Sequence, residues 1–467
     1  MNAWLGDACG LADAVRRGEV KAAEALEGSL AAIAGSKLNA IVTLDAEGAR
    51  RQTEVIDRRV KQGEDPGLFA GVPLLVKDVE DVAGLPTSHG SIVFKDDIAK
   101  RDSTHVERLR AAGVVIVGKC ATSEFGFVAY TATKLHGVTR NPWNLERTPA
   151  GSSGGSASAV AGGLVPAATG GDGGGSIRIP ASYCGLVGMK GTFGRIPRGP
   201  QAQYGQIAAV KGTVARSVRD AARWYDMTCG YDARDPFSLL RVDGWEAGLG
   251  TRSVKGLRVA VSIDLGNAVV HPEVARVVGD AAEVLIEAAG LQRVDVPVKV
   301  PENGIAWASA GLPSLVADLG DKWPECKEDL TFEIRFGMEA APTYRAHHGA
   351  RLEHFRVEMN EAMADLFEST DLLICATSPI EPFAAEGPMP NQVGEVGVSP
   401  FNSGALTIPA NLSGYPAISI PAGLSRDGLP IGLQVYARRH EDALLLDLAL
   451  AMESAQPWPL VAPGAPV

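Results

Sequence analysis

Hydrophobic and polar positions along the chain switch repeatedly between the spacing of a helix and that of a buried strand. Residues 11–17, 22–33 and 45–61 carry apolar side chains at helical spacing, which predicts helices near the N-terminus. Residues 72–76 form a short apolar run, typical of a buried strand, that stops at Lys77. Helices and a buried strand in alternation indicate a sheet with helices packed on it.

The alternation continues toward the C-terminus. Thr104 and Glu107 predict a capping box at the start of a helix that ends at Gly113, and residues 114–117 form a second apolar run. Pro272 is expected near the start of a later helix. The other predicted elements are strands at 257–261, 292–296, 371–375, 417–420 and 431–435, and helices at 350–367 and 441–454. This order predicts an α/β fold.

Nothing in the sequence marks a domain boundary. The chain has no internal repeat, no low-complexity linker and no abrupt change in composition, so we expect a single domain over residues 1–467. Residues 231–394 carry the fewest motif-like features, and we expect a variable insert there.

The composition disfavours several classes of protein. The net charge is −11 and no block of five or more basic residues occurs, so the charge pattern does not favour nucleic acid or an anionic membrane as a partner. The first residues lack the pattern of a signal peptide, and no run approaches the ~18 apolar residues of a membrane span. The six cysteines are widely spaced, without a CxxC pair. We therefore expect a cytoplasmic protein with reduced, mostly buried thiols.

Residues 151–194 contain two glycine-rich loops, each with a serine. Ser152 lies in the first loop, and Ser176 follows Gly175 at the end of a glycine run in the second. Glycine permits positive φ and lets backbone N–H groups converge on one point, an arrangement that stabilises an oxyanion. Neither loop has the Lys-Ser/Thr of a Walker loop or a GxGxxG pattern. An ordinary glycine-rich turn would not explain two serine loops with a lysine upstream.

Lys77 is a candidate base because it directly follows the apolar run at 72–76. An exposed lysine, the more common fate of this residue, has a pKa of about 10.4 and stays charged at neutral pH. Burial disfavours the charged form. A buried, neutral Lys77 could therefore activate a serine hydroxyl, which is a poor nucleophile until a base removes its proton.

Several stretches of the sequence resemble the amidase signature family, and together they cover most of the chain. The stretches are VPLLVKD at 72–78, GSSGGSA at 151–157, GDGGGSIRIPA at 171–181, GMKGTFGR at 188–195, NLSGYPA at 411–417 and GLPIGLQ at 428–434. The resemblance implies a large twisted mixed β-sheet surrounded by helices, with a signature core at about residues 72–195.

The family uses a Ser–cis-Ser–Lys triad, and the resemblance implies its positions here. By motif position, Ser176 is the nucleophile that forms an acyl-enzyme and Lys77 is the base. Ser152 and Ser153 compete for the bridging role; the bridge is the first serine of the family's pair, which selects Ser152 and leaves Ser153 to support the loop. The implied oxyanion hole consists of backbone N–H groups of Gly173, Gly174, Gly175 and Ser176.

The sequence departs from the family pattern at two positions. Gly173 stands where members often have Thr or another side chain, and Ala150 stands where they often have Gly. Because the oxyanion hole uses backbone N–H groups, we expect Gly173 to affect the substrate rather than the chemistry. Asp172 and Arg178 flank the loop, either as a pair that holds the oxyanion turn in shape or as a solvated surface pair. We favour the first, because a preorganised donor loop needs support.

A Ser-His-Asp triad and a metal site are the rival chemistries. His89 and His136 lie near motif segments and could line a pocket, but structural or surface roles are favoured, and no Gly-x-Ser-x-Gly elbow surrounds Ser176. His347 and His348 have no HExxH context. We therefore expect neither a metal nor an organic cofactor.

The resemblance implies an amidohydrolase that acts on a small-molecule carboxylic amide, with esters and carbamates as further candidate substrates. A homodimer is a candidate oligomeric state. The alternative is the glutaminase A subunit of a tRNA-dependent amidotransferase. That subunit usually has Gln at the position of Ile179 and an Arg-Ile-Met-Leu-Gly stretch, for which residues 334–337 (IRFG) are the nearest candidate, so both departures disfavour it. The motifs do not identify the amide; we expect specificity in loops around 125–136, 198–206 and parts of 307–390.

Overall fold

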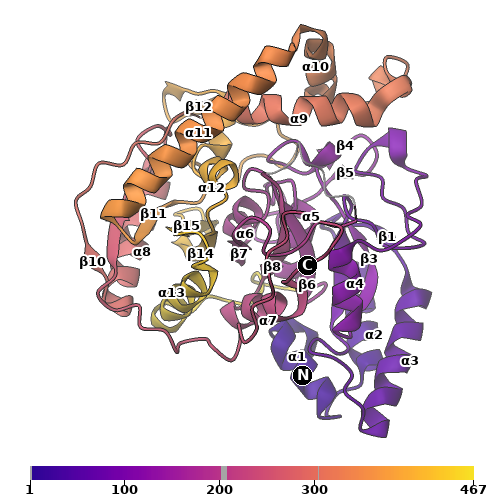
Figure 1. Cartoon of the computed structure of the whole chain (residues 1–467). Helices are drawn as coiled ribbons and strands as arrows, with labels where there is room; N and C mark the ends of the chain where they lie inside the picture. The colour runs from indigo at the N-terminus through magenta and orange to yellow at the C-terminus, as the bar shows by residue number, and fades with distance from the viewer. Residues whose placement is uncertain (1–2, 201–207, 303) are drawn as a thin grey trace.

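One large β-sheet forms the centre of the molecule (Figure 1). The structure is a computed structural model, and it describes residues 3–200, 208–302 and 304–467. Within these residues the sheet has eleven strands, in the order β1 (Ile41–Leu44), β3 (Val115–Cys120), β2 (Pro73–Lys77), β6 (Ala167–Asp172), β8 (Val210–Ala215), β7 (Val187–Lys190), β14 (Ala417–Leu424), β15 (Pro430–Ala437), β11 (Leu372–Ala376), β9 (Arg258–Val261) and β10 (Gln292–Arg293).

The sheet is mixed, as the sequence predicts. β2 runs parallel to both of its neighbours, β3 and β6, and β9 runs parallel to β10 and β11. The pairs in the middle of the sheet, from β6 through β8, β7, β14 and β15 to β11, are antiparallel. All residues of β2 are buried. A strand that is covered on both faces has no solvent-exposed face, so its sequence does not alternate between apolar and polar residues. This explains the continuous apolar run before Lys77.

Helices surround the sheet, and the predicted α/β architecture is confirmed. The described helices are α1 (Ala8–Arg16), α2 (Ala22–Gly35), α3 (Ala46–Gln62), α4 (Thr104–Ala111), α5 (Gly154–Ala161), α6 (Arg178–Cys184), α7 (Val218–Thr228), α8 (Pro272–Ala289), α9 (Gly304–Leu319), α10 (Phe332–Ala340), α11 (Ala346–Ser369), α12 (Ile408–Ser413) and α13 (Asp442–Ala455). α5 and α6 pack on β6, β7 and β15, whereas α13 packs on α7 and α8, and these three helices cover β8, β14 and β15.

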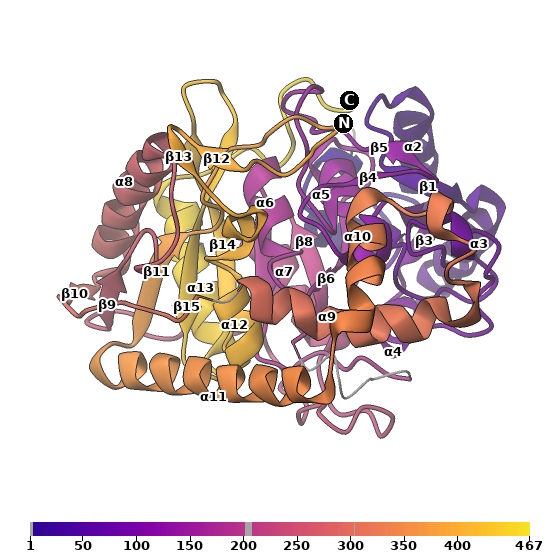
Figure 2. The same cartoon turned by 90° about the horizontal axis from the view of Figure 1, so that it is seen from above.

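The segment 231–394 is not separate from the sheet. It supplies β9, β10 and β11, which extend the sheet beyond β15, and the helices α8 to α11. α9, α10 and α11 form an orange band along one side of the molecule, away from the N-terminal helices (Figures 1 and 2). That this segment varies among relatives stays a prediction. Two small hairpin sheets, β4–β5 (Ala132–Thr133 and Gly137–Val138) and β12–β13 (Gln392–Val393 and Val396–Gly397), complete the strands.

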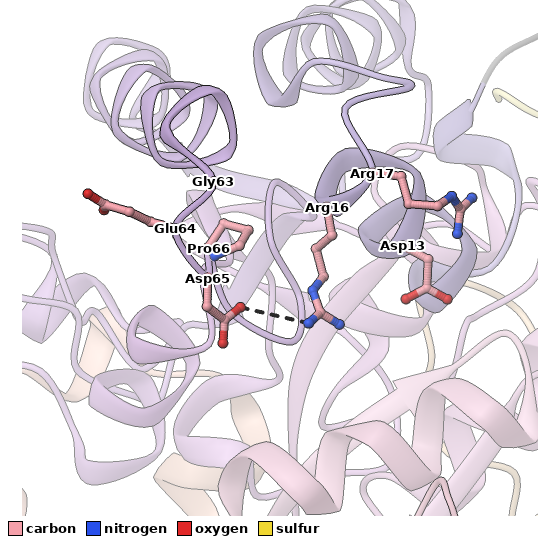
Figure 3. A pocket seen from close by; sticks show the side chains of 7 residues that line it. All are labelled: Asp13, Arg16, Arg17, Gly63, Glu64, Asp65 and Pro66. Atoms are coloured by element: carbon pink, nitrogen blue, oxygen red, sulfur yellow. Dashed lines mark ion pairs between the residues drawn. The ribbon is translucent and has the colours of Figure 1, made fainter.

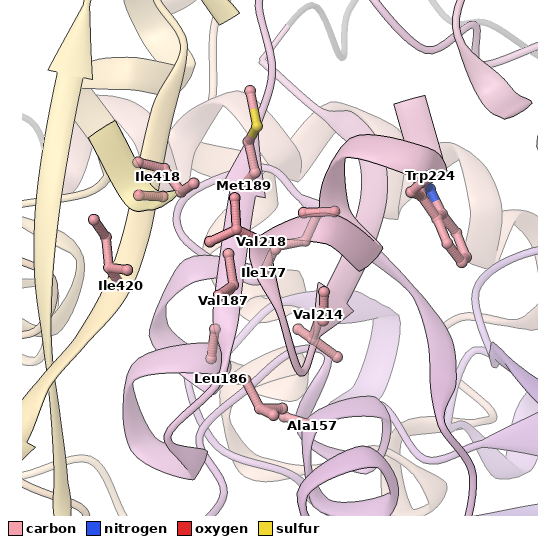
Figure 4. Packing of buried hydrophobic residues seen from close by; sticks show 14 of the residues in the cluster. Ala157, Ile177, Leu186, Val187, Met189, Val214, Val218, Trp224, Ile418 and Ile420 are labelled. Atoms are coloured by element: carbon pink, nitrogen blue, oxygen red, sulfur yellow. The ribbon is translucent and has the colours of Figure 1, made fainter. Parts of the chain in front are cut away.

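The core lies where the central strands meet their helices. Figure 4 shows side chains from α5, α7, β7, β8 and β14 that belong to one hydrophobic cluster, among them Met189, Val214, Trp224 and Ile418. All six cysteines are buried and unpaired, as predicted. No helix in the part of the chain that the structure describes is both long and apolar enough to cross a membrane.

Two local predictions need correction, and one helix was not predicted. The N-cap of α4 is Ser103, whose hydroxyl accepts a hydrogen bond from the N–H of Val106. Thr104 is not the cap, because it already belongs to the helix and its hydroxyl donates to Asp232. The strand predicted at 292–296 ends at Arg293, where its pairing with β9 stops. The helix that was not predicted is α5, a buried helix of Gly, Ser and Ala with one Val, into which the first serine loop continues directly. There is no room for a side chain at Gly155, since a Cβ on it would lie 2.4 Å from the backbone nitrogen of Ala121.

Candidate active site

Lys77 lies at the carboxyl end of β2, buried between β3 and β6. It is 3% exposed, and its Nζ lies 2.6 Å from Oγ of Ser152 and 3.5 Å from the carbonyl oxygen of Gly171. Its backbone N–H donates to Oγ1 of Thr169 on β6 at 2.9 Å, which fixes the end of the strand. The predicted base is therefore buried and in contact with the predicted bridging serine.

Burial lowers the pKa of Lys77 from its usual 10.5 to about 7, and the positive charge of Lys211 acts in the same direction. The negative charges of Asp172 and Glu80 oppose this shift. Near neutral pH a large fraction of Lys77 is therefore uncharged. An uncharged amine within hydrogen-bond distance of a hydroxyl can accept its proton.

Ser152 and Ser153 lie in the loop before α5, and their environments differ. The peptide bond between Gly151 and Ser152 is cis, at the position that the family resemblance implies. Ser152 is 2% exposed, and its hydroxyl is the one that contacts the lysine. Ser153 faces the second glycine loop: its hydroxyl lies 3.4 Å from the carbonyl oxygen of Gly171, and its N–H donates to the carbonyl oxygen of Ser176 at 3.3 Å. The geometry thus distinguishes the two serines.

Ser176 lies at the end of the second glycine loop, just before α6, and is partly exposed. It lines two cavities, and one of them is also lined by Lys77 and Ser152. The fold therefore brings the three predicted catalytic residues to one cavity. They come from the end of β2, the loop before α5 and the loop before α6.

Asp172 and Arg178 form a buried ion pair at the base of the second loop. Nε and Nη2 of the guanidinium donate to the two carboxylate oxygens, each at 2.9 Å, and both side chains are 0% exposed. The carboxylate also accepts the N–H groups of Gly175 at 2.7 Å and Ile177 at 3.3 Å. Burial opposes ionisation, but the charge and hydrogen bonds of Arg178 hold the pKa of Asp172 well below its usual range. The pair therefore shapes the loop from inside the protein rather than lying on the surface.

Two residues that no prediction named complete this buried network. Asn411 donates to the carbonyl oxygen of Asp172 at 2.8 Å, and its own Oδ1 accepts from Arg178 at 2.7 Å. Gln434 accepts from Arg178 at 2.7 Å. Both lie in the C-terminal motifs at 411–417 and 428–434, so the motifs were the signal that could have identified them.

Two further side chains orient the peptide groups of the loop. Trp307 donates its indole N–H to the carbonyl oxygen of Gly173 at 2.7 Å, and Thr407 donates its hydroxyl to that of Gly174 at 2.6 Å. In a trans peptide group the C=O of one residue and the N–H of the next point in opposite directions. The N–H of Gly174 therefore points away from Trp307, and the N–H of Gly175 points away from Thr407. Trp307 and Thr407 lie outside the motifs, and no sequence signal singled them out.

One of the four predicted oxyanion donors is already engaged. The N–H of Gly175 donates to Asp172, so its assignment to the oxyanion hole is corrected: the buried carboxylate takes this donor to hold the turn. The N–H groups of Gly173, Gly174 and Ser176 have no hydrogen-bond acceptor among the residues that the structure describes. These three remain as candidate donors.

Two cavities meet at Ser176. An apolar cavity of about 400 Å³ has Ile179 in its wall, and a more polar one of about 510 Å³ contains the lysine and the bridging serine. Segments 125–136 and 307–390, where we expected specificity, each contribute lining residues to both cavities. Of the third segment, residues 198–200 line the polar cavity, and residues 201–206 lie outside the described part of the chain.

The histidines do not form a triad with Ser176. His89 lines the polar cavity, and its ring stacks on Phe125 with centroids 6.1 Å apart. Nε2 of His136 lies 3.2 Å from the hydroxyl of Ser88, and His136 lines neither of the two cavities. Burial lowers the pKa of both imidazoles. Among the described residues, no histidine nitrogen hydrogen-bonds to Ser176.

A separate hollow of about 630 Å³ lies between α1 and the end of α3, away from these residues (Figure 3). Its lining is mostly charged, and Arg16 and Asp65 face each other across it at 3.8 Å. Asp13 is engaged by Arg219 and Arg223. None of the predicted site residues lines this hollow, so it is not a second candidate for the active site.

Comparison with known proteins identifies the family of this chain. The family model described as Amidase matches residues 24–446. An acylamidase of Rhodococcus erythropolis is 35% identical over 90% of this chain and 89% of its own length. The A subunit of the glutamyl-tRNA(Gln) amidotransferase of Cyanothece sp. is 34% identical over 90% of this chain and 92% of its own length.

Among solved structures, a bacterial aryl acylamidase of the amidase signature family superposes with a TM-score of 0.91. It is 30% identical, and the match covers 98% of each chain. The chain therefore belongs to the amidase signature family. It is an amidase, a hydrolase of small-molecule amides that cleaves the bond between the carbonyl carbon and nitrogen.

Proposed function

We propose that this amidase works through an acyl-enzyme on Ser176, with Ser152 as proton bridge and Lys77 as base. The observation that carries the proposal is the 2.6 Å contact between Nζ of Lys77 and Oγ of Ser152 in a buried site. The lowered pKa of Lys77, about 7, adds to it, because the amine can exchange a proton near neutral pH.

In the first half of the reaction, Lys77 takes a proton from Ser152 while Ser152 takes one from Ser176. The freed oxygen of Ser176 attacks the carbonyl carbon of the amide. The N–H groups of Gly173, Gly174 and Ser176 are the available donors for the negative oxygen that forms. The proton then returns from Lys77 through Ser152 to the amide nitrogen, the C–N bond breaks, and the amine leaves.

In the second half, water replaces the amine. The same relay takes a proton from the water, and the resulting hydroxide attacks the ester carbonyl of the acyl-enzyme. The ester bond breaks, Ser176 regains its proton and the carboxylic acid leaves. The buried pair of Asp172 and Arg178 acts only through the loop: it keeps the donors in place and exchanges no proton.

The chain is proposed to act without a partner protein rather than as the glutaminase of an amidotransferase. Ile179 supports this, since the glutaminase usually has a glutamine at this position, and here the residue forms an apolar wall beside Ser176. Phe336, within the divergent stretch 334–337, lines the same cavity. An apolar cavity does not suit the polar side chain of free glutamine.

The purified chain alone, assayed on simple amides and on glutamine, tests this proposal. We expect amide hydrolysis without a partner, little glutaminase activity, and a mass increase at Ser176 after treatment with a fluorophosphonate. Ser176→Ala should lose both turnover and labelling while its circular dichroism stays unchanged. Labelling at another serine, or turnover that appears only with amidotransferase partners, would refute it.

A further inference from the structure

The apolar and polar cavities that meet at Ser176 have different relations to the proton relay. Ser176, Gly126, Phe127 and Trp307 line both cavities. The residues of the relay do not: Lys77 and Ser152 line only the polar cavity. The reacting carbon of an amide bound at Ser176 therefore lies between two unequal spaces.

This asymmetry orients the substrate if the proposed relay operates. The leaving nitrogen must receive its proton from Ser152, so it has to lie on the side of Ser152, which faces the polar cavity. The acyl substituent leaves the carbonyl carbon in a different direction from the nitrogen. The apolar cavity is the other space that adjoins Ser176, and it is the one open to the acyl group.

The chemistry of the apolar cavity suits an uncharged hydrocarbon. Among the described residues that line it, Glu333 is the one ionisable side chain, and its carboxylate accepts the hydroxyl of Tyr130 at 2.6 Å. The large apolar lining residues include Phe127, Ile179, Trp307, Phe336, Phe401 and Ile408. A cavity of about 400 Å³ with such walls has room for a phenyl ring or a medium-length alkyl chain.

Helix α10 carries two aromatic residues at the mouth of this cavity. Phe332 and Phe336 lie one helical turn apart, with ring centroids separated by 6.1 Å and planes at 25°. They are 66% and 63% exposed, although both line the cavity. Large apolar side chains left open beside an apolar cavity gain from a ligand that covers them.

The position of α10 is fixed relative to the rest of the site. Thr331, just before the helix, donates its N–H and its hydroxyl to Glu124, at 2.7 and 2.6 Å. Ile334 and Met338, on the inner side of the helix, are buried in a hydrophobic cluster with Leu315 of α9. The two phenylalanines are thus held at the mouth of the cavity rather than placed on a free surface loop.

We propose that this protein prefers amides with an apolar, phenyl-sized or medium-length group on the acyl side, and that Phe332 and Phe336 set this preference. The inference rests on the proposed roles of Ser176, Ser152 and Lys77. It adds the direction in which the substrate lies, and it names two specificity-determining residues outside the signature motifs.

Two isomeric amides test the direction. N-methyl-2-phenylacetamide carries its phenyl ring on the acyl side, and N-benzylacetamide carries it on the amine side. A methylene insulates the ring in both, and both release an alkylamine, so their intrinsic reactivities are similar. We expect kcat/KM to be about tenfold or more higher for the phenylacetyl isomer.

Equal values, or a preference for N-benzylacetamide, would overturn the inference and leave the proposed amidase mechanism standing. Failure on both isomers and on all simple amides would refute the mechanism itself.

Substitutions on α10 test the two residues. Phe332→Ala and Phe336→Ala should each lower kcat/KM for the phenylacetyl isomer several-fold, and by a clearly larger factor than for N-benzylacetamide. Tyr231→Ala is the matched control, because Tyr231 is an aromatic residue that is 61% exposed and lines a different surface pocket. Equal losses on both isomers, or no loss in either variant, would overturn the assignment of these residues.

Discussion

The amino group of Lys77 lies 2.6 Å from the hydroxyl of Ser152, and both residues are almost completely buried. The two come from distant parts of the chain, one from the end of β2 and the other from the loop that leads into α5. Lys190 on β7 offers a contrast: it is also fully buried with a pKa lowered to about 7, but it donates to the carbonyl oxygen of Gly191. Burial alone therefore does not distinguish Lys77; its contact with a serine hydroxyl does.

The first prediction concerns pH. Burial lowers the pKa of Lys77 to about 7, and only the uncharged amine can act as a base, so turnover should fall as the pH drops below 7 and level off above it. In a plot of log kcat against pH, the acid limb should have a slope of about one, as expected for a single ionisation. Lys77→Arg should be inactive at every pH, because arginine stays protonated. An active Lys77→Arg enzyme would show that Lys77 is only a structural cation.

The second prediction separates the adjacent serines. Ser152→Ala removes the hydroxyl that contacts Lys77, so it should lower amide turnover by about 10²-fold or more and still allow slow labelling of Ser176 by a fluorophosphonate. Ser153→Ala removes only contacts to the second loop, and its loss should be smaller. The reverse order of the two losses would mean that Ser153 is the bridge.

The third prediction compares the two buried lysines. An unfolded lysine binds a proton below about pH 10.5, whereas the folded chain releases it above about pH 7. Between these values the free energy of unfolding of the wild type rises with pH, by up to about 1.4 kcal/mol per unit for each lysine. Lys77→Met and Lys190→Met should therefore both be more stable than the wild type at pH 7, and this gain should shrink toward pH 10.

The activities of the same two variants should differ. Lys77→Met should lose turnover, whereas Lys190→Met should keep most of it, since Lys190 does not contact Ser152. Urea unfolding at pH 7 and pH 9.5, with turnover measured in parallel, checks both outcomes. A Lys190→Met enzyme as inactive as Lys77→Met would show that loss of a buried lysine disrupts the site in general.

The sequence predicted the parts of the site that depend on short local patterns. The apolar run before Lys77 predicted a buried strand, and the glycines before Ser176 predicted a turn whose N–H groups converge on one point. The sequence did not reveal Trp307 or Thr407, which hold the carbonyl groups of that turn from more than a hundred residues away. A single side chain that reaches a loop through the tertiary fold leaves no periodic pattern around itself.

Local patterns were also insufficient in two places. No helix was predicted over α5, and its small Gly, Ser and Ala side chains are what allow this helix to be buried against Ala121 and β6. Thr104 and Glu107 fitted a capping box, yet Ser103, one residue earlier, caps the helix. In both cases packing against distant segments decided between alternatives that the local sequence left equally acceptable.

The fourth prediction concerns the buried pair. Asp172→Asn leaves the charge of Arg178 buried without its partner, so it should lower the free energy of unfolding by about 3–5 kcal/mol and reduce turnover by loosening the loop. Because the pKa of Asp172 is lowered in the folded state, its contribution is present above about pH 4 and is lost as the pH falls below that value. Asp371→Asn is the control, since the pairs of Asp371 with Arg258 and Arg438 are partly exposed and their loss should cost much less stability than that of the buried pair. Equal effects of the two substitutions would contradict the assigned role.

The last prediction is that Lys77 matters more for amides than for activated esters. In the proposed relay Lys77 removes a proton, through Ser152, when Ser176 attacks, and it supplies one, through the same bridge, when the amine leaves. An amide nitrogen leaves poorly unless it is protonated, whereas a nitrophenolate leaves without a proton, so the ester needs only the first of these transfers. Since assistance of this kind is typically worth about 10²–10⁴-fold per step, Lys77→Ala should lower amide hydrolysis by a much larger factor than hydrolysis of the nitrophenyl ester of the same acid. Steady-state rates on a phenylacetyl amide and the matching nitrophenyl ester decide the question, and equal losses on the two substrates would argue against any role of Lys77 in the departure of the amine.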